Sequence, residues 1–352
     1  MLFRSSFSVS ETGVLVYPTG SLIPTTQLTS FDREGRRLGT QGPPLEVQAI
    51  SVSPDGKRVA VEKYDLKDNG FDVWIVEPNG TLSRFTSNLR GSTPLWSGDG
   101  QRILYSHFAD TFHIRSLRDS KVEDLPPPVT NTAQWPRSWS TDASHLLFMT
   151  NAAETKSDLW DLSLTDGKVT PIANSKFSEE QGAFLPDSHW VAYVSDEQGR
   201  FEVYVDSFPK PGNKTRISTS GGQSPQWRND GKELFFLGTD GKLMAATVAF
   251  SNGTIQIGTP HALFQAPQIG DNDTRILYAP TDNGTRFVWT NTASAFWNSS
   301  TAWSNAPAGG NTPPSQGGGA DYVLEFLGSG AASYTDRKST RLNSSHVSES
   351  RM

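Results

Sequence analysis

The sequence has no cysteine among its 352 residues. This excludes disulfide bonds and thiolate metal sites, and it is compatible with a reducing or an oxidising compartment. No run of 18 apolar residues is present, so no segment of this chain is predicted to span a bilayer. The first residues, Met1 to Arg4 followed by serines, also lack the apolar stretch of a signal peptide, although a truncated N-terminus would look the same.

Basic patches and clustered metal ligands are also scarce. The net charge is −6 and no Lys/Arg-rich run occurs before the last 20 residues, so the chain lacks the basic footprint that nucleic-acid binding requires. Six histidines are scattered and never paired at short spacing, which argues against zinc. The acidic stretches 65–70 and 271–273 do not match the calcium-binding loop, and we interpret them as solvated loops. We therefore predict no metal and no cofactor.

Turn-forming and aromatic residues are plentiful instead. The chain has 31 Gly, 22 Pro, 19 Phe and 10 Trp, a composition that favours an all-β fold over a helical one. Turn signals recur every 8–12 residues or so, and no helical pattern of about ten residues or more competes with them.

One pattern occurs seven times. It consists of an aromatic residue or Val, a tight turn and a short apolar strand, and it covers Phe7–Tyr17, Val52–Val61, Trp96–Tyr105, Trp139–Phe148, Phe184–Tyr193, Trp227–Phe236 and Tyr278–Trp289. The turn positions are Thr12, Asp55, Asp99, Asp142, Asp187, Asp230 and Asn283, so neighbours lie 43 to 45 residues apart except across the last gap of 53. A period near 44 is typical of four-stranded propeller blades.

The turn chemistry explains the pattern. Pro54 presets φ, Asp55 hydrogen-bonds the nearby backbone and Gly56 can adopt positive φ, which together make a hairpin. Because a catalytic residue is needed once whereas a turn residue is needed in every blade, we assign structural roles to the recurring turn residues Asp55, Gly56, Asp99, Gly100, Asp142, Asp187, Asp230 and Gly231. We also expect the recurring Trp96, Trp139 and Trp227 to pack between blades.

The predicted fold is an all-β propeller of about seven (six to eight) four-stranded antiparallel blades. An incomplete ring is kept as an alternative to a closed one. We assign the propeller to residues 1–290, with repeats at about 5–45, 46–90, 91–130, 131–176, 177–219, 220–268 and from 272–290 onward. Residues 291–335 are a low-complexity segment with a closing strand expected at 321–327. The tail 336–352 resembles a translated sequencing adapter and is set aside.

The repeat resembles the TolB-like β-propeller repeat of bacteria, which is marked by Ser-Pro-Asp-Gly-Lys-Arg as at Ser53–Arg58. Four segments, Phe7–Tyr17, Gln27–Gly35, Ser195–Tyr204 and Gly221–Leu234, are also similar to the C-terminal propeller of large bacterial serine/threonine protein kinases, common in Acidobacteria. That resemblance implies a membrane-anchored parent kinase with this region on the extracytoplasmic or periplasmic side.

The kinase machinery itself is missing from this chain. It has no His-Arg-Asp loop, no Asp-Phe-Gly and no Gly-rich loop followed by Val-Ala-Ile-Lys, and it has no Gly-x-Ser-x-Gly elbow of a serine hydrolase. We therefore predict a non-catalytic module, expected to be a monomer, that binds or senses a protein or small ligand. Two alternatives stay open: the substrate-gating propeller of a prolyl-oligopeptidase-type peptidase, and a free periplasmic TolB-like scaffold.

A propeller has two faces, and the turns of the repeated motif occupy one of them. Loops that join successive blades and loops between second and third strands share the other face, where we expect a ligand to bind. The candidate residues on that face are Arg90, Gln134, Glu180, Gln181, Asp196, Arg200 and Gln223.

Overall fold

The structure is a computed structural model. It describes residues 25–292, with gaps at 66–67, 88–90, 108–110, 126, 130–131, 153–155, 252–253 and 268–276, and four short strands outside that range. The chain divides into two compact units. One unit is Thr25–Thr292, and the other combines Met1–Pro24 with Ala293–Met352. Each unit is described by itself.

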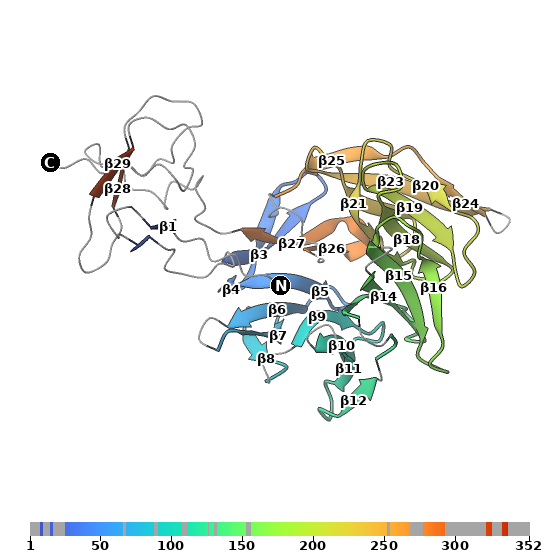
Figure 1. Cartoon of the computed structure of the whole chain (residues 1–352), viewed down its shortest axis with the longest axis horizontal. Coiled ribbons are helices and arrows are strands. Elements are labelled where there is room, and N and C mark those ends of the chain that lie inside the picture. The colour runs from blue at the N-terminus through green and yellow to red at the C-terminus, as the bar shows by residue number, and fades with distance from the viewer. Residues whose placement is uncertain are drawn as a thin grey trace. The chain divides into compact units, whose positions relative to one another are not determined.

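The larger unit is a ring of six antiparallel blades, five with four strands and one with a fifth (Figure 1), which confirms the predicted all-β propeller and lies within the predicted six to eight blades. The one helical element among the described residues is a 3-10 turn, η1 (Asp282–Gly284). No helix in the described ranges has the length and apolarity that a bilayer span requires.

Blades 1 to 3 follow the chain from the inner strand outward. Blade 1 contains β5 (Val47–Val52), β6 (Val59–Asp65), β7 (Gly70–Val76) and β8 (Leu82–Arg84). Blade 2 contains β9 (Gly91–Trp96), β10 (Arg102–His107), β11 (Thr111–Ser116) and β12 (Val122–Leu125). Blade 3 contains β13 (Gln134–Trp139), β14 (His145–Ala152), β15 (Lys156–Ser163) and β16 (Val169–Ala173).

Blades 4 and 5 continue the same order. Blade 4 contains β17 (Glu179–Phe184), β18 (Trp190–Ser195), β19 (Glu202–Ser207) and β20 (Thr215–Arg216). Blade 5 contains β21 (Gln223–Trp227), β22 (Glu233–Leu237), β23 (Lys242–Ser251), β24 (Thr254–Ile257) and β25 (His261–Gln265). The long strand β23 pairs with β25 through its first half and with β24 through its second half, so blade 5 carries an additional hairpin.

Blade 6 closes the ring from both ends of the unit. Its inner strands are β26 (Tyr278–Thr281) and β27 (Arg286–Thr292), and its outer strands are β3 (Thr26–Asp32) and β4 (Arg37–Leu45). β27 pairs with β3 along its full length. The repeats expected at 5–45 and from 272 onward therefore share one blade, which is why seven motifs build six blades. The inner strands contact one another in the order β5, β9, β13, β17, β21 and β26, and β26 returns to β5.

The described residues of the smaller unit form two strand pairs. β1 (Ser8–Val9) pairs with β2 (Leu15–Val16), within the first predicted hairpin. β28 (Tyr322–Glu325) pairs with β29 (Ser333–Asp336). The strand expected at 321–327 to complete the last blade thus pairs elsewhere, and β3 and β4 complete that blade. The rest of the predicted low-complexity segment and of the tail lies outside the described residues.

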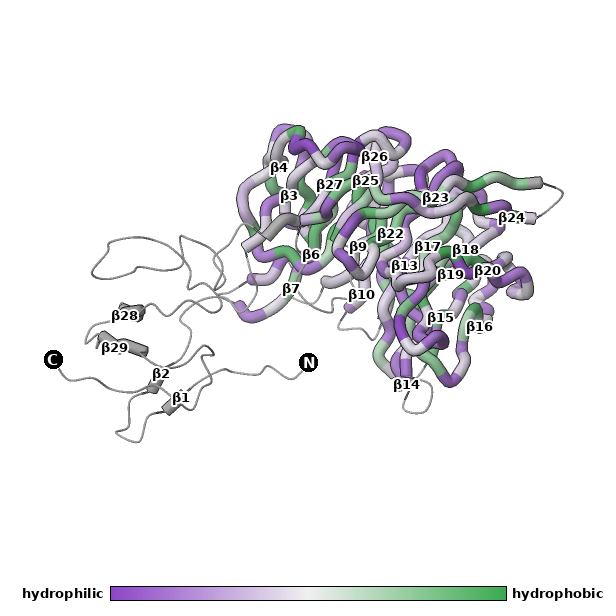
Figure 2. The backbone as a smooth tube through the Cα atoms, turned by 90° about the horizontal axis from the view of Figure 1, so that it is seen from above, coloured by the Kyte–Doolittle hydropathy of each residue, from purple (hydrophilic) through white to green (hydrophobic). Residues whose placement is uncertain are grey.

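The core consists of six apolar layers, one in each gap between neighbouring blades. The layer between blades 6 and 1, for example, joins Leu28 and Val288 to Ile50 and Val61. Apolar stretches accordingly lie within the strands and polar stretches at the turns (Figure 2). Since each blade buries its faces against the next one, the ring depends on every interface being present.

The motif turn requires a left-handed residue after its Asp. Gly56, Gly100 and Gly231 meet this requirement with φ between 65° and 72°. In blade 4 the residue at this position is Ser188, with a φ of 58°. Among the described residues its side chain forms no hydrogen bond. A side chain in this region costs about 1–2 kcal/mol, because its Cβ crowds the backbone.

We expect Ser188→Gly to stabilise the chain by about 0.5–1 kcal/mol, since relief of strain exceeds the added freedom of the unfolded chain. Urea unfolding measures the change. The mirror control is Gly167→Ala, at φ 73° with open space around the new methyl group, which should destabilise by about 1 kcal/mol. A loss of stability in Ser188→Gly would contradict the strain argument.

Candidate functional site

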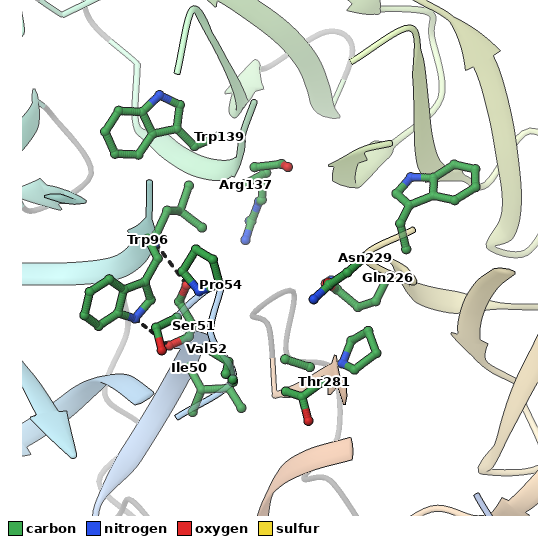
Figure 3. Close-up of a pocket in the computed structure, with 17 residues that line it drawn as sticks. Ile50, Ser51, Val52, Pro54, Trp96, Arg137, Trp139, Gln226, Asn229 and Thr281 are labelled. Atoms are coloured by element: carbon green, nitrogen blue, oxygen red, sulfur yellow. Dashed lines mark hydrogen bonds between the residues drawn. The ribbon is translucent and has the colours of Figure 1, made fainter. Parts of the chain in front are cut away.

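A cavity of about 230 Å³ lies on the ring axis, at the face of the motif turns. It is lined by the last residues of the inner strands of blades 1, 2, 3, 5 and 6 and by the turns of blades 1 and 5 (Figure 3). The face expected to bind a ligand is the opposite one, so the cavity lies at the other end of the axis from the predicted residues.

The lining follows from the repeat. The inner-strand residue before the aromatic position is Ser51, Leu95, Ser138 and Gln226 in blades 1, 2, 3 and 5, and all four line the cavity. Ala279 occupies the same place in blade 6. A repeated backbone position thus brings five side chains to one axis, and three of them, Ser51, Ser138 and Gln226, are neutral and polar.

Arg137 is the one charged residue among the described residues that line the cavity. It lies in β13 at a bulge, where the register with β14 shifts between Pro136 and Ser138. Arg137 is 3% exposed, and one terminal nitrogen of its guanidinium donates to Met149 Sδ at 3.5 Å. Figure 3 shows the side chain directed toward the middle of the cavity, with Gln226 and Asn229 across from it.

The motif turns around the cavity are held by their own hydrogen bonds. Asp55 Oδ1 accepts from the Ser53 hydroxyl at 2.5 Å and from Lys57 N at 3.1 Å. In the equivalent turn of blade 3, hydrogen bonds from the Ser140 and Ser144 hydroxyls hold the pKa of Asp142 at about 2. Each of these carboxylates therefore serves as a turn acceptor.

The other turn aspartates also accept hydrogen bonds within their own turns. Asp187 accepts from His189 N at 2.9 Å, and Asp230 accepts from Lys232 N at 3.1 Å. The hydrogen bond from Ser97 is the largest influence on Asp99, and it lowers the pKa of that carboxyl. Gly56, Gly100 and Gly231 follow the acids at positive φ.

In blades 6 and 1, a motif arginine connects the turn to that of the following blade. Arg286 of blade 6 donates to Gly56 O at 2.7 Å, and Arg58 of blade 1 donates to Gly100 O at 3.2 Å. Arg58 also stacks on Trp96 of blade 2, with the guanidinium carbon 4.6 Å from the ring centroid. An arginine occupies this motif position in blades 1, 2 and 6, which marks it as structural.

The residues predicted for the opposite face are largely engaged within the protein. Gln134 is buried and exchanges hydrogen bonds with the backbone of Val129. The Gln181 side chain accepts from Ser224 N of blade 5 at 2.6 Å. Glu180 is buried in β17, Gln223 is exposed at the start of β21, and Arg90 lies outside the described residues.

Two further residues of that set lie on the loop between β18 and β19. Asp196 accepts from Lys156 Nζ at 2.8 Å and from Ser178 N at 2.9 Å. Arg200 donates to Glu202 Oε1 at 2.7 Å and to Thr219 O at 2.6 Å. These contacts connect blade 3 to blade 4 and order the loop. A ligand role for this set stays a prediction.

Buried carboxylates at the third strands also have structural partners. Asp72 accepts from the Thr86 hydroxyl at 2.6 Å, and that hydroxyl accepts from Val73 N at 2.9 Å. Glu202 repeats the arrangement with Ser218 in blade 4. Since the same geometry recurs in different blades, it fixes the outer strand to the third strand.

The His145–Asp161 pair is the nearest arrangement to an acid–base dyad. Burial raises the pKa of Asp161 to about 6 against the opposing influence of His145, whose Nδ1 lies 3.0 Å from Oδ2. The His145 ring packs edge-on against Phe208, at 4.9 Å between centroids. Neither residue lines the cavity. Among the described residues no three His, Asp or Glu side chains converge as a metal site would require. The acidic stretches 65–70 and 271–273 lie partly and wholly outside those residues.

Sequence reasoning missed the cavity residues Arg137, Gln226 and Asn229. A signal for the first was available: the two residues before the aromatic position are uncharged in the repeats of blades 1, 2, 4 and 5, and Arg137 breaks that rule in blade 3. The sequence contains no comparable signal for the end of the ring axis at which the cavity forms.

Several solved structures share this fold. A putative TolB from Agrobacterium tumefaciens has a TM-score of 0.58 at 14% identity, covering 78% of this chain and 100% of that one. An oligogalacturonate lyase in complex with manganese has a TM-score of 0.54 at 14% identity, covering 78% and 80%. TolB from Acinetobacter baumannii has a TM-score of 0.50 at 17% identity, covering 68% and 65%. At these identities the likeness shows the fold alone.

Sequence similarity points to one family. The Tol-Pal system protein TolB of Nitratidesulfovibrio vulgaris is 41% identical over 63 residues, which are 17% of this chain and 14% of that protein, so the match spans a small part of the relative. The family model described as the TolB beta propeller domain matches residues 91–305, more than half of the chain. The chain therefore belongs to the TolB beta propeller domain family.

Proposed function

We propose that this propeller is a non-catalytic module that binds a protein segment or small ligand in its axial cavity. One observation carries the proposal. The described residues that line the cavity offer neutral hydrogen-bonding groups and one guanidinium, but no carboxylate and no histidine. Such a lining can hold and orient a ligand, whereas general acid–base catalysis needs a group that exchanges protons near neutral pH.

We also propose that the propeller belongs to a bacterial serine/threonine protein kinase and samples ligands on the extracytoplasmic side of the membrane. The four segments similar to kinase-linked propellers support this parentage. The source DNA upstream of residue 1 should then encode a kinase domain with its His-Arg-Asp loop. A peptidase-gating role is not favoured, because the similar solved structures described above include TolB proteins and a lyase.

The absence of catalysis is tested on the full chain. We expect no phosphoryl transfer when it is incubated with labelled ATP and peptide substrates, because the groups that hold metal and phosphates in kinases are missing. A kinase domain from an unrelated source serves as the positive control. Turnover above that of a heat-denatured sample would refute a purely binding role.

A further inference from the structure

We propose that the axial cavity binds one neutral sugar ring through four side chains of its lining, Ser51, Ser138, Gln226 and Asn229; this inference rests on the binding role proposed above. The sugar is a free monosaccharide or the terminal residue of a glycan. Arg137 takes no part, because its guanidinium is already engaged within the protein, where one terminal nitrogen donates to Met149 Sδ. Only neutral groups of the lining therefore remain for a ligand.

Two serines occupy the same place in the repeat of blades 1 and 3 and line the cavity. Ser51 Oγ accepts from Trp96 N at 3.1 Å, and Ser138 Oγ accepts from Phe184 N at 3.0 Å, so each hydroxyl holds the inner strand of the following blade. A serine hydroxyl also has one hydrogen to donate. In the described part of the chain no group accepts that hydrogen from either serine. Each serine is thus a fixed donor for a ligand oxygen.

Gln226 occupies the same place in blade 5, but it lacks the structural partner that the serines have. The residue of blade 6 that matches Trp96 and Phe184 is Pro280, which has no N–H to donate. Gln226 therefore has no such hydrogen bond to accept, and its amide forms none with the other described residues. A polar side chain that lines the axis without holding the next blade is expected of a ligand site.

Asn229 adds a second amide on the same side of the cavity as Gln226 (Figure 3). Asn229 is exposed at the mouth, whereas Gln226 is half-buried. Each amide presents N–H donors and a carbonyl acceptor. A carboxylate can only accept and an apolar ligand can do neither, so either would displace water and leave part of the amides without a partner. A sugar hydroxyl donates and accepts, and neighbouring hydroxyls of one ring can bind both amides.

Apolar residues complete the lining and set its size. Ile50, Pro54, Leu95 and Pro280 offer surfaces against which the C–H groups of a sugar ring can pack. A volume of about 230 Å³ equals roughly eight water molecules at about 30 Å³ each. One hexose ring fits this space, and the second ring of a disaccharide would lie outside the mouth.

Calorimetric titration of the full chain tests the assignment. The probes are glucose, galactose and mannose, and cyclohexanol serves as a ring with a single hydroxyl. We expect at least one hexose to bind at least about tenfold more tightly than cyclohexanol, because its further hydroxyls form hydrogen bonds in the cavity. The uronate of that hexose should bind no more tightly than the hexose, since the proposed contacts are neutral.

Disaccharides separate the two sources of the sugar. Maltose, lactose and mannobiose carry glucose, galactose and mannose at their non-reducing ends. Affinity equal to that of the free hexose identifies the terminal residue of a glycan as the ligand. A weaker affinity identifies the free monosaccharide.

Three variants locate the binding. Gln226→Leu keeps the size of the side chain but removes its amide, and it should weaken hexose binding about tenfold. Asn229→Ala should weaken it about threefold or more. Gln101→Leu is the matched control, since it is the same substitution at an exposed residue of a motif turn that does not line the cavity. Its affinity should stay within about twofold of the wild type.

The outcomes separate this inference from the proposed function. Hexoses that bind no better than cyclohexanol, or a uronate that binds more tightly than its hexose, overturn the sugar site and leave a binding role intact. Unchanged affinity in Asn229→Ala overturns it as well, and this variant decides if Gln226→Leu fails to fold, because Asn229 is exposed. Turnover of ATP or peptide by the wild type would refute the non-catalytic role whatever the sugars do.

Discussion

A fragment that begins at residue 46 and ends at 292 is expected to lose the folded ring, whereas a fragment of residues 25–292 keeps it. The shorter fragment lacks β3 and β4, which are half of blade 6. β27 would lose all of its backbone pairing with β3, from the pair Thr26 and Thr292 to the pair Asp32 and Arg286. That edge of β27 would then be exposed. A free apolar edge of this kind pairs with other chains and aggregates.

Deletion of β3 and β4 removes a large part of the free energy of unfolding of the ring. Leu28 and Leu45 are buried in the layer between blades 6 and 1, and each contributes about 1.5–3 kcal/mol by burial. The lost layer and ladder together exceed about 5 kcal/mol, against the roughly 5–15 kcal/mol by which domains are stable. Near-ultraviolet circular dichroism and size-exclusion chromatography measure the outcome. A cooperative melt of fragment 46–292 at the midpoint of fragment 25–292 would show that the ring does not depend on this closure.

The blades themselves were predictable because their signal is local. A turn such as Ser53–Arg58 encodes its own hairpin within six residues, through hydroxyl, carboxylate and left-handed glycine, and the same chemistry returns with each blade. The packing of Trp96 and Trp227 between blades also follows from their recurrence, and each indole N–H donates to a carbonyl of the preceding blade, at 3.0 Å.

Closure of the ring was not predictable in the same way. The pairing of Thr29 with Trp289 joins residues at opposite ends of the unit, and neither neighbourhood encodes its partner. Counting motifs therefore gave seven units, although the motif at Tyr278–Trp289 and the strands after residue 25 build one blade. Its partner motif at 7–17 forms a strand pair in the other unit.

The position of the cavity depended on packing rather than on pattern. Hydrophilic residues such as Gln134 and Gln181 were expected to face a ligand, yet their side chains bond to neighbouring backbone. Arg137, in contrast, lies in the stretch Trp-Pro-Arg-Ser-Trp, whose pattern predicts a buried strand. A β-bulge redirects a side chain without leaving a clear mark in the sequence, so the axial direction of Arg137 emerges only from the folded strand.

Glu233→Gln is expected to destabilise the ring by about 2–3 kcal/mol, because this buried carboxylate joins blade 5 to the closing blade. Its oxygens accept from both terminal nitrogens of Arg33, each at 2.9 Å, and from Arg228 at 2.8 Å. Arg33 also donates to Gly284 O at 3.0 Å, so one guanidinium spans the two blades. The amide of Gln leaves two arginines beside a single neutral acceptor.

The effect should depend on pH. Burial acts to raise the pKa of Glu233, but the hydrogen bonds from Arg33 and Arg228 outweigh it and hold that pKa below its ordinary value. A carboxyl group whose pKa is lowered by folding stabilises the fold above its unfolded pKa, about 4.3, and the contribution disappears as the pH falls through the folded pKa. The difference between wild type and variant is therefore full at neutral pH and shrinks in acid, below about pH 4.3.

Glu34→Gln is the matched control for this prediction. It is the same substitution one residue away from Arg33, in an exposed pair with Arg36 at 3.0 Å, and it should cost less than about 0.5 kcal/mol at any pH. Urea unfolding of the three proteins at neutral and acidic pH gives the comparison. Equal losses in Glu233→Gln and Glu34→Gln would mean that the ring is held by its apolar layers alone and that the ion pair at the closure contributes nothing of its own.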